Sequence, residues 1–204
     1  MTPNTVFTVG HSTHSISDFL SLLQKHGITA VADVRSMPVS RFTPQFNRYA
    51  VERSLSDVNI KYVFLGKELG ARTEDLTCYV DGRVRYDLLA QTSDFVSGIK
   101  RLRNGLQSER IAVMCAEQEP LDCHRCVLVA RVLEGYGITV EHIHGDGHVE
   151  DHASAMRRLM VNFGLDQEDL FRTSAERLQE ALDRQEQRIA YVNEELRIDG
   201  MPGR

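Results

Sequence analysis

Short apolar, strand-like runs alternate with helix-like stretches along most of this chain. The strand-like runs are TVFTVGHS (5–12), ITAVADVRS (28–36), KYVFLG (61–66), RIAVMCAE (110–117) and ITVEHIHG (138–145). Helix-like patterns cover 15–27, 46–59, 86–107 (with a break near Ser93) and 123–137, while 67–85 has a loop-like composition. Parallel neighbouring strands need long crossover connections, and helices usually provide them. The alternation therefore predicts an α/β protein, a Rossmann-like three-layer α/β/α sandwich with a mostly parallel sheet.

The last quarter of the chain has a different pattern, so we predict an α/β domain over 1–150 and a C-terminal helical extension over 151–204. A helix is expected over 173–198, opened by a capping box of Thr173 and Glu176. Its apolar stripe, with one polar interruption, consists of Leu178, Leu182, Gln185, Ile189, Val192 and Leu196. Such a stripe either packs on the chain's own domain or forms a homodimer through the C-terminal helix.

Composition excludes some classes of protein. The formal net charge is −5, so a protein that coats nucleic acid without sequence preference is not expected. No apolar run approaches the roughly 20 residues that cross a bilayer, and we expect no membrane partner. The start, MTPNTVFTVGHS, lacks the pattern of a secretory signal. We therefore expect a cytoplasmic protein, in which the four cysteines stay reduced.

Polar residues follow several of the predicted strands. His11 and Ser12 end the first strand, Asp33 and Arg35 the second, and Cys115 the fourth, with Glu117 beside it. The fifth predicted strand ends in His142 and His144. Open α/β sheets bind ligands outside the carboxyl ends of their strands. We therefore predict that these residues meet at one edge of the sheet.

The stretch VMCAEQEPLDCHRC (113–126) allows four interpretations. Buried filler is the first, since free cysteine is among the most buried residue types, and we expect Cys126 in the core. A redox pair is the second, because Cys123-x-x-Cys126 opens a predicted helix. A zinc or iron site is the third, formed by Cys115, Cys123 and a histidine, either His124 or His11. A second candidate metal site is a separate histidine cluster that contains His142, His144, Asp146, His148 and His152.

A catalytic pocket is the fourth interpretation. Asp122 could cap the helix that Cys123 opens, and the backbone N–H groups there attract anions. Arg125 adds a fixed charge, so a thiolate could act as nucleophile. His124 or His11 could then serve as the acid or base.

The segment DVRSMPVSRFTPQFNRY (33–49) interleaves arginines with aromatic residues. Guanidinium groups suit phosphates, and aromatic rings offer faces on which bases stack. Arg41 and Asn47 belong to this segment. It favours an anionic small molecule or a nucleic-acid fragment as partner. The alternative is a loop whose aromatics anchor it and whose arginines pair with nearby acids.

The motifs together identify a family resemblance. VGHST near the start, DVRSMPVSRF with FN after it, LGKELG, and MCAEQEPLDCHRC resemble domain-of-unknown-function family 488 from about Phe7 to His144. The resemblance implies a Rossmann-like fold and a pocket formed by the motif residues. Those residues are Gly10, His11, Ser12, Thr13, Asp33, Arg35, Pro38, Ser40, Arg41, Phe46, Asn47, Cys115, Glu117, Cys123, His124 and Arg125. A small polar residue is usual where this chain has Cys126. The family carries no established reaction.

We therefore predict an enzyme-like pocket for an anionic, nucleotide-like or nucleic-acid-derived ligand. Its catalytic groups are expected to be Cys115, Cys123, His124 and His11. Its ligand contacts are expected to be Ser12, Asp33, Arg35, Arg41, Asn47, Glu117 and Arg125. Two alternatives stay open: a binding module without catalysis, and a metal-dependent enzyme that uses Cys115, Cys123 and a histidine.

Overall fold

A six-stranded, mostly parallel sheet forms the centre of the protein. The computed structural model describes residues 4–197. The strands lie in the order β3-β2-β6-β1-β7-β8, with the bounds β1 Thr5–Gly10, β2 Ala30–Asp33, β3 Lys61–Phe64, β6 Ile111–Cys115, β7 Thr139–Ile143 and β8 Val149–Asp151. The first five strands of that order run parallel, and β8 returns antiparallel to β7. The predicted fold class is confirmed.

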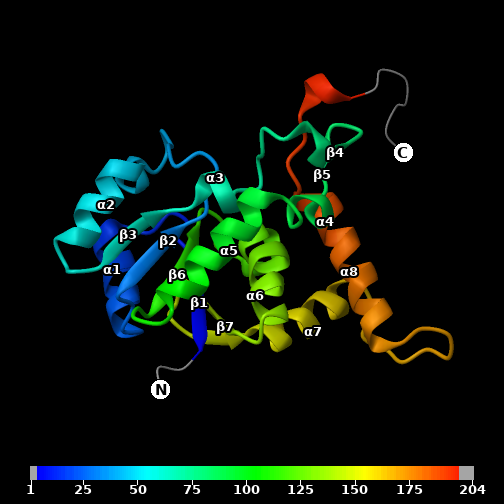
Figure 1. Cartoon of the computed structure of the whole chain (residues 1–204). Coiled ribbons are helices and arrows are strands. Elements are labelled where there is room, and N and C mark those ends of the chain that lie inside the picture. Colours follow the sequence, from blue (N-terminus) through cyan, green and yellow to red (C-terminus); the bar gives the residue numbers. More distant parts are fainter. Residues whose placement is uncertain (1–3, 198–204) are drawn as a thin grey trace.

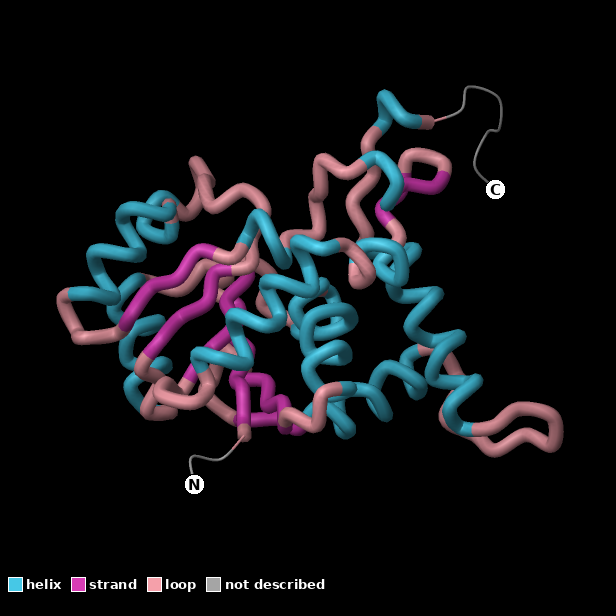
Figure 2. Tube along the Cα trace, in the orientation of Figure 1, coloured by secondary structure: helices cyan, strands magenta, loops and turns pink. Residues whose placement is uncertain are grey.

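Helices cover both faces of the sheet (Figures 1 and 2). On one face, α1 (Ile16–Lys25) and α2 (Arg48–Ser56) pack against apolar side chains of β1, β2 and β6. On the other face, α5 (Ser93–Gly105), α6 (Arg131–Gly135) and α7 (His152–Asn162) form the second half of the core. Successive residues of β1 alternate between the two, with Val6 in one half and Phe7 in the other, because side chains of a strand alternate sides.

The helix boundaries predicted from capping residues are largely correct. The Ser15 hydroxyl accepts a hydrogen bond from Asp18 N at the start of α1, and Gly27 follows its end with φ 62°. The predicted break near Ser93 is also confirmed. A short helix α4 (Tyr86–Leu89) ends before it, and Thr92 caps α5 by accepting from Phe95 N.

The segment 67–85, predicted as loop, contains short regular elements. They are α3 (Gly66–Leu69), the 3-10 turn η2 (Leu76–Cys78), and a hairpin of β4 (Tyr79–Val80) and β5 (Arg83–Val84). Leu69, Cys78 and Val84 are each buried and anchor these elements. Three widely spaced anchors form no periodic apolar pattern, so periodicity does not predict these elements.

The helix predicted over 123–137 is not a regular α-helix. A 3-10 turn, η3 (Pro120–Asp122), precedes it, and its first part is a π-helical segment, η4 (Arg125–Ala130), which continues into α6. The predicted capping by Asp122 is wrong, because its Oδ1 accepts a hydrogen bond from Gln185 Nε2 at 3.1 Å instead. Single π-helical turns occur often at functional sites, since the wider turn redirects side chains.

The C-terminal helix packs on its own chain. The capping box of Thr173 and Glu176 is present at the start of α8 (Ser174–Ile189). Leu182 and Gln185 are buried, and Gln185 Nε2 donates to Leu121 O at 2.9 Å. This stripe is thus used within the chain, and a homodimer through the remaining surface of α8 stays a prediction.

The helix ends earlier than the predicted residue 198, which lies outside the described residues. After α8 the chain becomes extended, and Tyr191 O accepts from Val84 N in the hairpin. Val192 therefore pairs with Arg83, and Leu196 lies in a 3-10 turn, η5 (Glu194–Leu196). Residues of α7 and α8 share one core with the sheet. Within 4–197, no helix combines the length and apolar character needed to cross a membrane.

Candidate functional site

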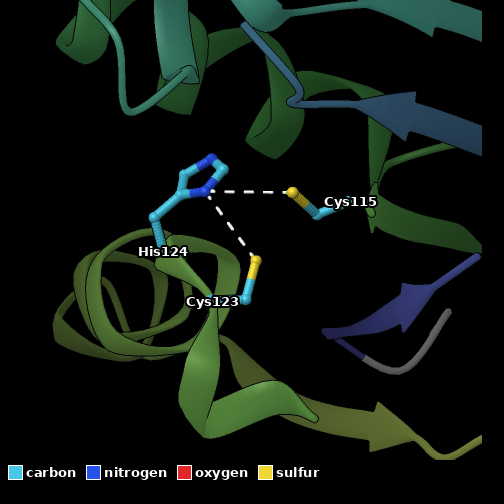
Figure 3. Close-up of side chains that lie close together, drawn as sticks. All are labelled: Cys115, Cys123 and His124. Atoms are coloured by element: carbon cyan, nitrogen blue, oxygen red, sulfur yellow. Dashed lines mark hydrogen bonds between the residues drawn. The ribbon is translucent and has the colours of Figure 1, made fainter. Parts of the chain in front are cut away.

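Two thiols and an imidazole meet at the carboxyl edge of the sheet (Figure 3). Cys115 is the last residue of β6, while Cys123 and His124 stand at the start of the η4 helix. The Nδ1 atom of His124 lies 3.9 Å from Cys115 Sγ and 3.8 Å from Cys123 Sγ. All three residues are buried. The chain turns back between β6 and the helix, and this brings the two cysteines together.

The backbone fixes the orientation of His124. Its Nε2 lies 3.2 Å from Val34 O, and because a carbonyl only accepts, Nε2 carries the proton of this hydrogen bond. The other ring nitrogen, Nδ1, therefore faces the two thiols. A neutral His124 can take a proton from a thiol there, and a protonated one can donate to a thiolate.

The environment of Cys123 favours a thiolate. The residue is extended (φ −138°) directly before the helix, and its sulfur accepts a hydrogen bond from Arg125 N at 3.5 Å. In the thiol form its S–H donates to Glu117 Oε2 at 3.0 Å. Burial alone would raise the pKa of Cys123. The hydrogen bond from Cys115 and the charges of Arg125 and His124 outweigh burial, so the pKa lies well below the usual range.

The neighbouring groups shift in the opposite direction. The pKa of Cys115 is raised, first because its thiol donates to the Cys123 thiolate and further because it is buried. Burial and the nearby thiolate raise the pKa of Glu117. The pKa of His124 is raised by the Cys123 thiolate, against the effect of burial. These shifts favour the thiolate at Cys123 and the thiol at Cys115, with Glu117 and His124 as the groups that can hold the proton of Cys123.

The Arg125 side chain is fully buried and binds the backbone of the loop after β6. Its Nη1 donates to Glu117 O at 2.7 Å and its Nη2 to Gln118 O at 2.9 Å, which fixes the loop after β6. The loop lies so close to Gly10 that a Cβ there would stand 1.8 Å from Glu117 O. The charge of the Arg125 guanidinium lowers the pKa of Cys123, and its role as a direct ligand contact stays a prediction.

A second buried network holds Arg35. Its Nε and Nη2 donate to the two carboxylate oxygens of Asp33 at 2.9 and 2.6 Å, and Tyr62 also donates to Asp33 at 2.8 Å. The Nη1 atom of Arg35 lies 3.0 Å from His11 Nε2. His11 Nδ1 lies 2.9 Å from Ser12 O, to which it donates, so Nε2 accepts from Arg35.

Both ring nitrogens of His11 are consequently engaged within the protein. Its ring stacks on Phe46 with centroids 4.2 Å apart. Burial lowers the pKa of His11 to about 4, so it is neutral at pH 7. With both ring nitrogens engaged, His11 positions Arg35, and His124 is the imidazole that faces the thiols.

A cavity of ≈ 360 Å³ opens onto the thiols. Five predicted site residues line it: Arg35, Cys115, Glu117, Cys123 and His124. Sequence reasoning missed several others in its wall, including Ser36, Arg72, Tyr86, Ile189 and Tyr191. The Arg72 guanidinium lies over the Tyr191 ring, 4.7 Å from its centroid. Ser36 belongs to the DVRS motif, but no local motif marks the other four residues, because the tail and the segment 67–86 reach the cavity only in the folded chain.

Five predicted ligand contacts do not line this cavity: Asp33 and Arg125, described above, and Ser12, Arg41 and Asn47. Arg41 is exposed, and Asn47 Oδ1 accepts from Ser40 N at 2.6 Å, which braces the loop after β2. Ser12 has a left-handed backbone (φ 45°). The aromatics of the loop divide, since Phe46 is buried against His11 while Phe42 is 97% exposed.

The remaining cysteine and histidines lie elsewhere. Cys126 is buried, as predicted, and its sulfur lies against His142 and His152, at 3.6 and 3.9 Å. The Cys123 sulfur contacts Glu117 and His124, so the two sulfurs of the predicted redox pair have different neighbours, and that pair stays a prediction. All four cysteines, each within the described residues, are free. His144 and His148 stack on each other, apart from this buried pair.

Comparison with known proteins gives one family match. The family model described as "Domain of unknown function DUF488" matches residues 15–132, more than half of the chain. The match includes Asp33, Arg35 and the whole stretch from Cys115 to Cys126, and it is narrower than the resemblance traced from the motifs. Neither the curated proteins nor the solved structures include a significant match. The chain belongs to the DUF488 family.

Proposed function

We propose that this protein is an enzyme in which the Cys123 thiolate attacks an anionic, nucleotide-like substrate. The observation that carries the proposal is the environment of Cys123: a sulfur at a helix start, contacted by Arg125 N and facing His124 Nδ1. Low thiol pKa values at helix starts beside cationic groups are typical of reactive cysteines. The cavity in front of the sulfur provides room for a substrate.

The protonation states proposed for Cys123, Cys115 and His124 fit a group-transfer reaction. Cys123 would attack an electrophilic carbon, and the bond from that carbon to the leaving group would break. The leaving group keeps the electron pair of that bond and takes the proton held at His124 Nδ1, which faces the sulfur. Cys115 stays protonated, and its hydrogen bond stabilises the thiolate between turnovers. A water activated by the neutral His124 would then release the product.

Recognition of an anion would come from the rim of the cavity. Arg72 is exposed there with its guanidinium over the Tyr191 ring, and a planar guanidinium can pair with an anionic group or stack on a base. Arg35 uses three donors within the protein, so its fork is only partly available. This division makes Arg72 the residue on which affinity for an anionic group depends most.

Another hollow lacks the chemistry for this role. It has a volume of ≈ 590 Å³ and is lined by residues such as Asn4, Lys100, Arg103 and Tyr136. Its lining contains no cysteine, histidine or carboxylate. Of these two cavities, only the one at Cys123 is lined by both a nucleophile and a group that can carry its proton.

A metal-dependent reaction is the second candidate. One ligand atom each from Cys115, Cys123 and His124 lies within 4.8 Å of the others. Thiolate and imidazole ligands suit Zn²⁺. The thiolate reaction and the metal-dependent reaction cannot use Cys123 at the same time, because a sulfur bound to the ion is no longer a free nucleophile.

The test is the pH dependence of alkylation at Cys123. Iodoacetamide labelling is followed by mass spectrometry between pH 4 and 10, with and without a chelator. We expect labelling of Cys123 well below the ordinary thiol pKa of about 8.5, and a rise in that pKa in the His124→Gln variant. Cys78→Ser is the matched control, since Cys78 is buried outside the site and should leave the profile unchanged.

The possible outcomes separate the candidates. An ordinary pKa at Cys123 in metal-free protein contradicts a thiolate enzyme. Labelling that appears only after chelation favours the metal-dependent reaction. A nucleotide that raises the melting temperature of the wild-type protein and not of Arg72→Gln supports the anion contact. The same shift without a low thiol pKa would indicate a binding module without catalysis.

A further inference from the structure

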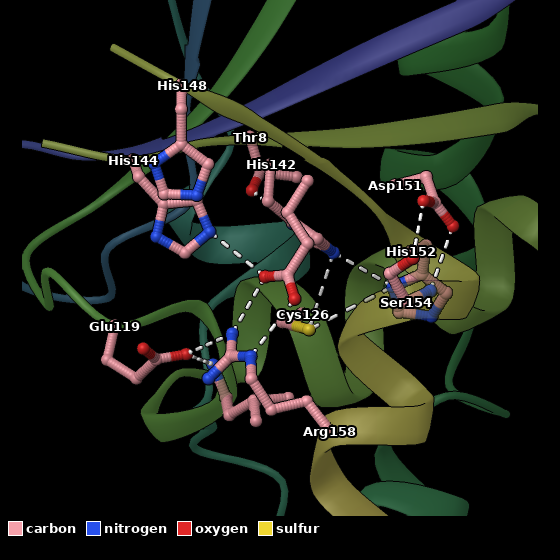
Figure 4. Close-up of polar contacts among 12 residues, drawn as sticks. Thr8, Glu119, Cys126, His142, His144, His148, Asp151, His152, Ser154 and Arg158 are labelled. Atoms are coloured by element: carbon pink, nitrogen blue, oxygen red, sulfur yellow. Dashed lines mark hydrogen bonds and ion pairs between the residues drawn. The ribbon is translucent and has the colours of Figure 1, made fainter. Parts of the chain in front are cut away.

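A second set of metal-ligating side chains lies in the core, apart from the cavity. Cys126 comes from the π-helical segment η4, His142 from β7, and His152 from the first turn of α7 (Figure 4). The three residues are at most 2% exposed. His142 and His152, which lie 16 and 26 positions away in the sequence, each bring one ring nitrogen close to Cys126 Sγ.

The spacing of the three atoms matches a metal centre. Cys126 Sγ lies 3.6 Å from His142 Nε2 and 3.9 Å from His152 Nδ1, and the two nitrogens are 2.9 Å apart. The circle through three points with those separations has a radius of about 2.0 Å, against Zn–N bonds of about 2.0–2.1 Å and Zn–S bonds of about 2.3 Å. An ion at the centre would need shifts of only a few tenths of an ångström.

The surroundings prepare the imidazoles for an ion. His142 Nδ1 lies 2.7 Å from the hydroxyl of Thr8, its neighbour across β1 and β7. When Nδ1–H donates to that hydroxyl, the lone pair of Nε2 turns inward, as in many metal sites with an outer-shell partner. Both rings are buried, and burial favours the neutral form that a metal ligand must have.

We propose that Cys126, His142 and His152 bind one transition-metal ion of the zinc or copper class. One thiolate and two imidazoles suit these metals, whereas Mg²⁺ and Ca²⁺ prefer oxygen ligands. The role is structural, because the cluster is closed to solvent and joins the helix that starts at Cys123 to β7 and α7. The site would therefore stabilise the second half of the core. It is independent of the reaction proposed at Cys123.

Two of the three proposed ligands lie outside the family match, which ends at residue 132, before both histidines. Serine is close to cysteine in size, so Cys126→Ser is expected to fold.

The experiment uses tag-free full-length protein, stripped with a chelator and loaded with Zn²⁺ or Co²⁺. To remove metal binding at the other thiol pair, the background carries Cys115→Ser and Cys123→Ser. We expect one ion per chain and, with Co²⁺, a near-ultraviolet band that arises from charge transfer from the thiolate to the ion. We also expect a Zn²⁺-dependent rise in melting temperature of about 5–10 °C at saturating metal. Cu²⁺ bound at the same residues would support the site equally.

Variants then assign the ion to the three residues. Cys126→Ser should abolish the charge-transfer band and the Zn²⁺-dependent shift in melting temperature. His152→Gln should weaken Co²⁺ binding at least tenfold. The matched control is Cys78→Ser, which should retain the full signal. For each variant, the melting temperature with metal is compared with that of the same variant without metal. A variant that is merely less stable therefore still shows the metal-dependent shift.

Two results would overturn the proposal. Stripped protein that takes up no Zn²⁺, Co²⁺ or Cu²⁺ at micromolar concentrations has no such site. Equal uptake by the background protein and by its Cys126→Ser variant would place the ion elsewhere. Neither result affects the thiolate reaction, which depends on Cys123 and is tested by alkylation.

Discussion

Removing the Asp33 carboxylate should destabilise the protein strongly. Asp33 and Arg35 form an ion pair of 2.6 Å in which the side chains are 0% and 7% exposed. In Asp33→Ala, the Nε and Nη2 donors of Arg35 and the Tyr62 hydroxyl lose their acceptor at once. A buried guanidinium charge then remains with His11 as its neighbour.

The structure sets the expected size of this effect. Breaking a buried, hydrogen-bonded ion pair by deleting one partner costs about 3–5 kcal/mol. For a protein of this length, 1 kcal/mol corresponds to about 2–4 °C in melting temperature. We therefore expect the melting temperature of Asp33→Ala to fall by about 6–20 °C.

Urea unfolding monitored by circular dichroism, together with a thermal scan, measures the loss. Lys61→Gln is the control, because it removes an ion pair with Glu109 in which the lysine side chain is 69% exposed. Exposed pairs contribute about 0–1 kcal/mol. A double variant, Asp33→Ala with Arg35→Met, removes the stranded charge and should recover at least about 1 kcal/mol of the loss.

The reasoning has a clear point of failure. If Asp33→Ala loses no more stability than Lys61→Gln, the buried pair does not hold the loop after β2. If the double variant is as unstable as the sum of the two single variants, the cost does not arise from an uncompensated charge.

Three further predictions concern other parts of the chain. His11 has a folded pKa of about 4 against an unfolded value of about 6.5, so the unfolded state binds more protons and stability falls as pH drops through that window. Urea unfolding at pH 7 and pH 4.5 should show about 2 kcal/mol of loss from this group, which His11→Gln removes; an equally steep pH dependence in the variant would refute this. Gly10→Ala should unfold the protein or displace the loop after β6, because its Cβ would meet Glu117 O at 1.8 Å, whereas Gly135→Ala, with open space around it, should raise the melting temperature slightly. Thr173→Ala should cost about 1 kcal/mol in urea unfolding through loss of the capping box, and an unchanged midpoint would contradict that role.

The architecture was predictable because its causes are local. Apolar runs of strand length, separated by amphipathic stretches, produced the parallel sheet, and capping residues such as Ser15 and Thr173 marked helix starts correctly. The elements between 67 and 85 were missed, because each is anchored by a single buried residue such as Leu69 or Val84. The π-helical segment was missed as well, since apolar spacing alone does not distinguish it from an α-helix.

The candidate site was predictable as a set of residue types, since strand ends of a parallel sheet meet at one edge. The separate roles of the residues in this site were not predictable from the sequence. Sequence reasoning placed His11 and His124 in the same role, whereas the fold engages both nitrogens of His11 and turns His124 Nδ1 to the sulfurs. It also left open a redox pair of Cys123 and Cys126, whereas these two sulfurs contact different neighbours in the folded chain.

The sequence by itself determined the alternation of elements, hence the sheet, and the presence of thiols, imidazoles and guanidinium groups at strand ends. Only the tertiary structure decided which of these groups touch. Contacts such as those of Cys126 with His142 and His152 join residues from a helix, a strand and a second helix. Hydrogen bonds and charge interactions act over a few ångströms. The reactivity of each group therefore depends on distances that exist only in the folded chain.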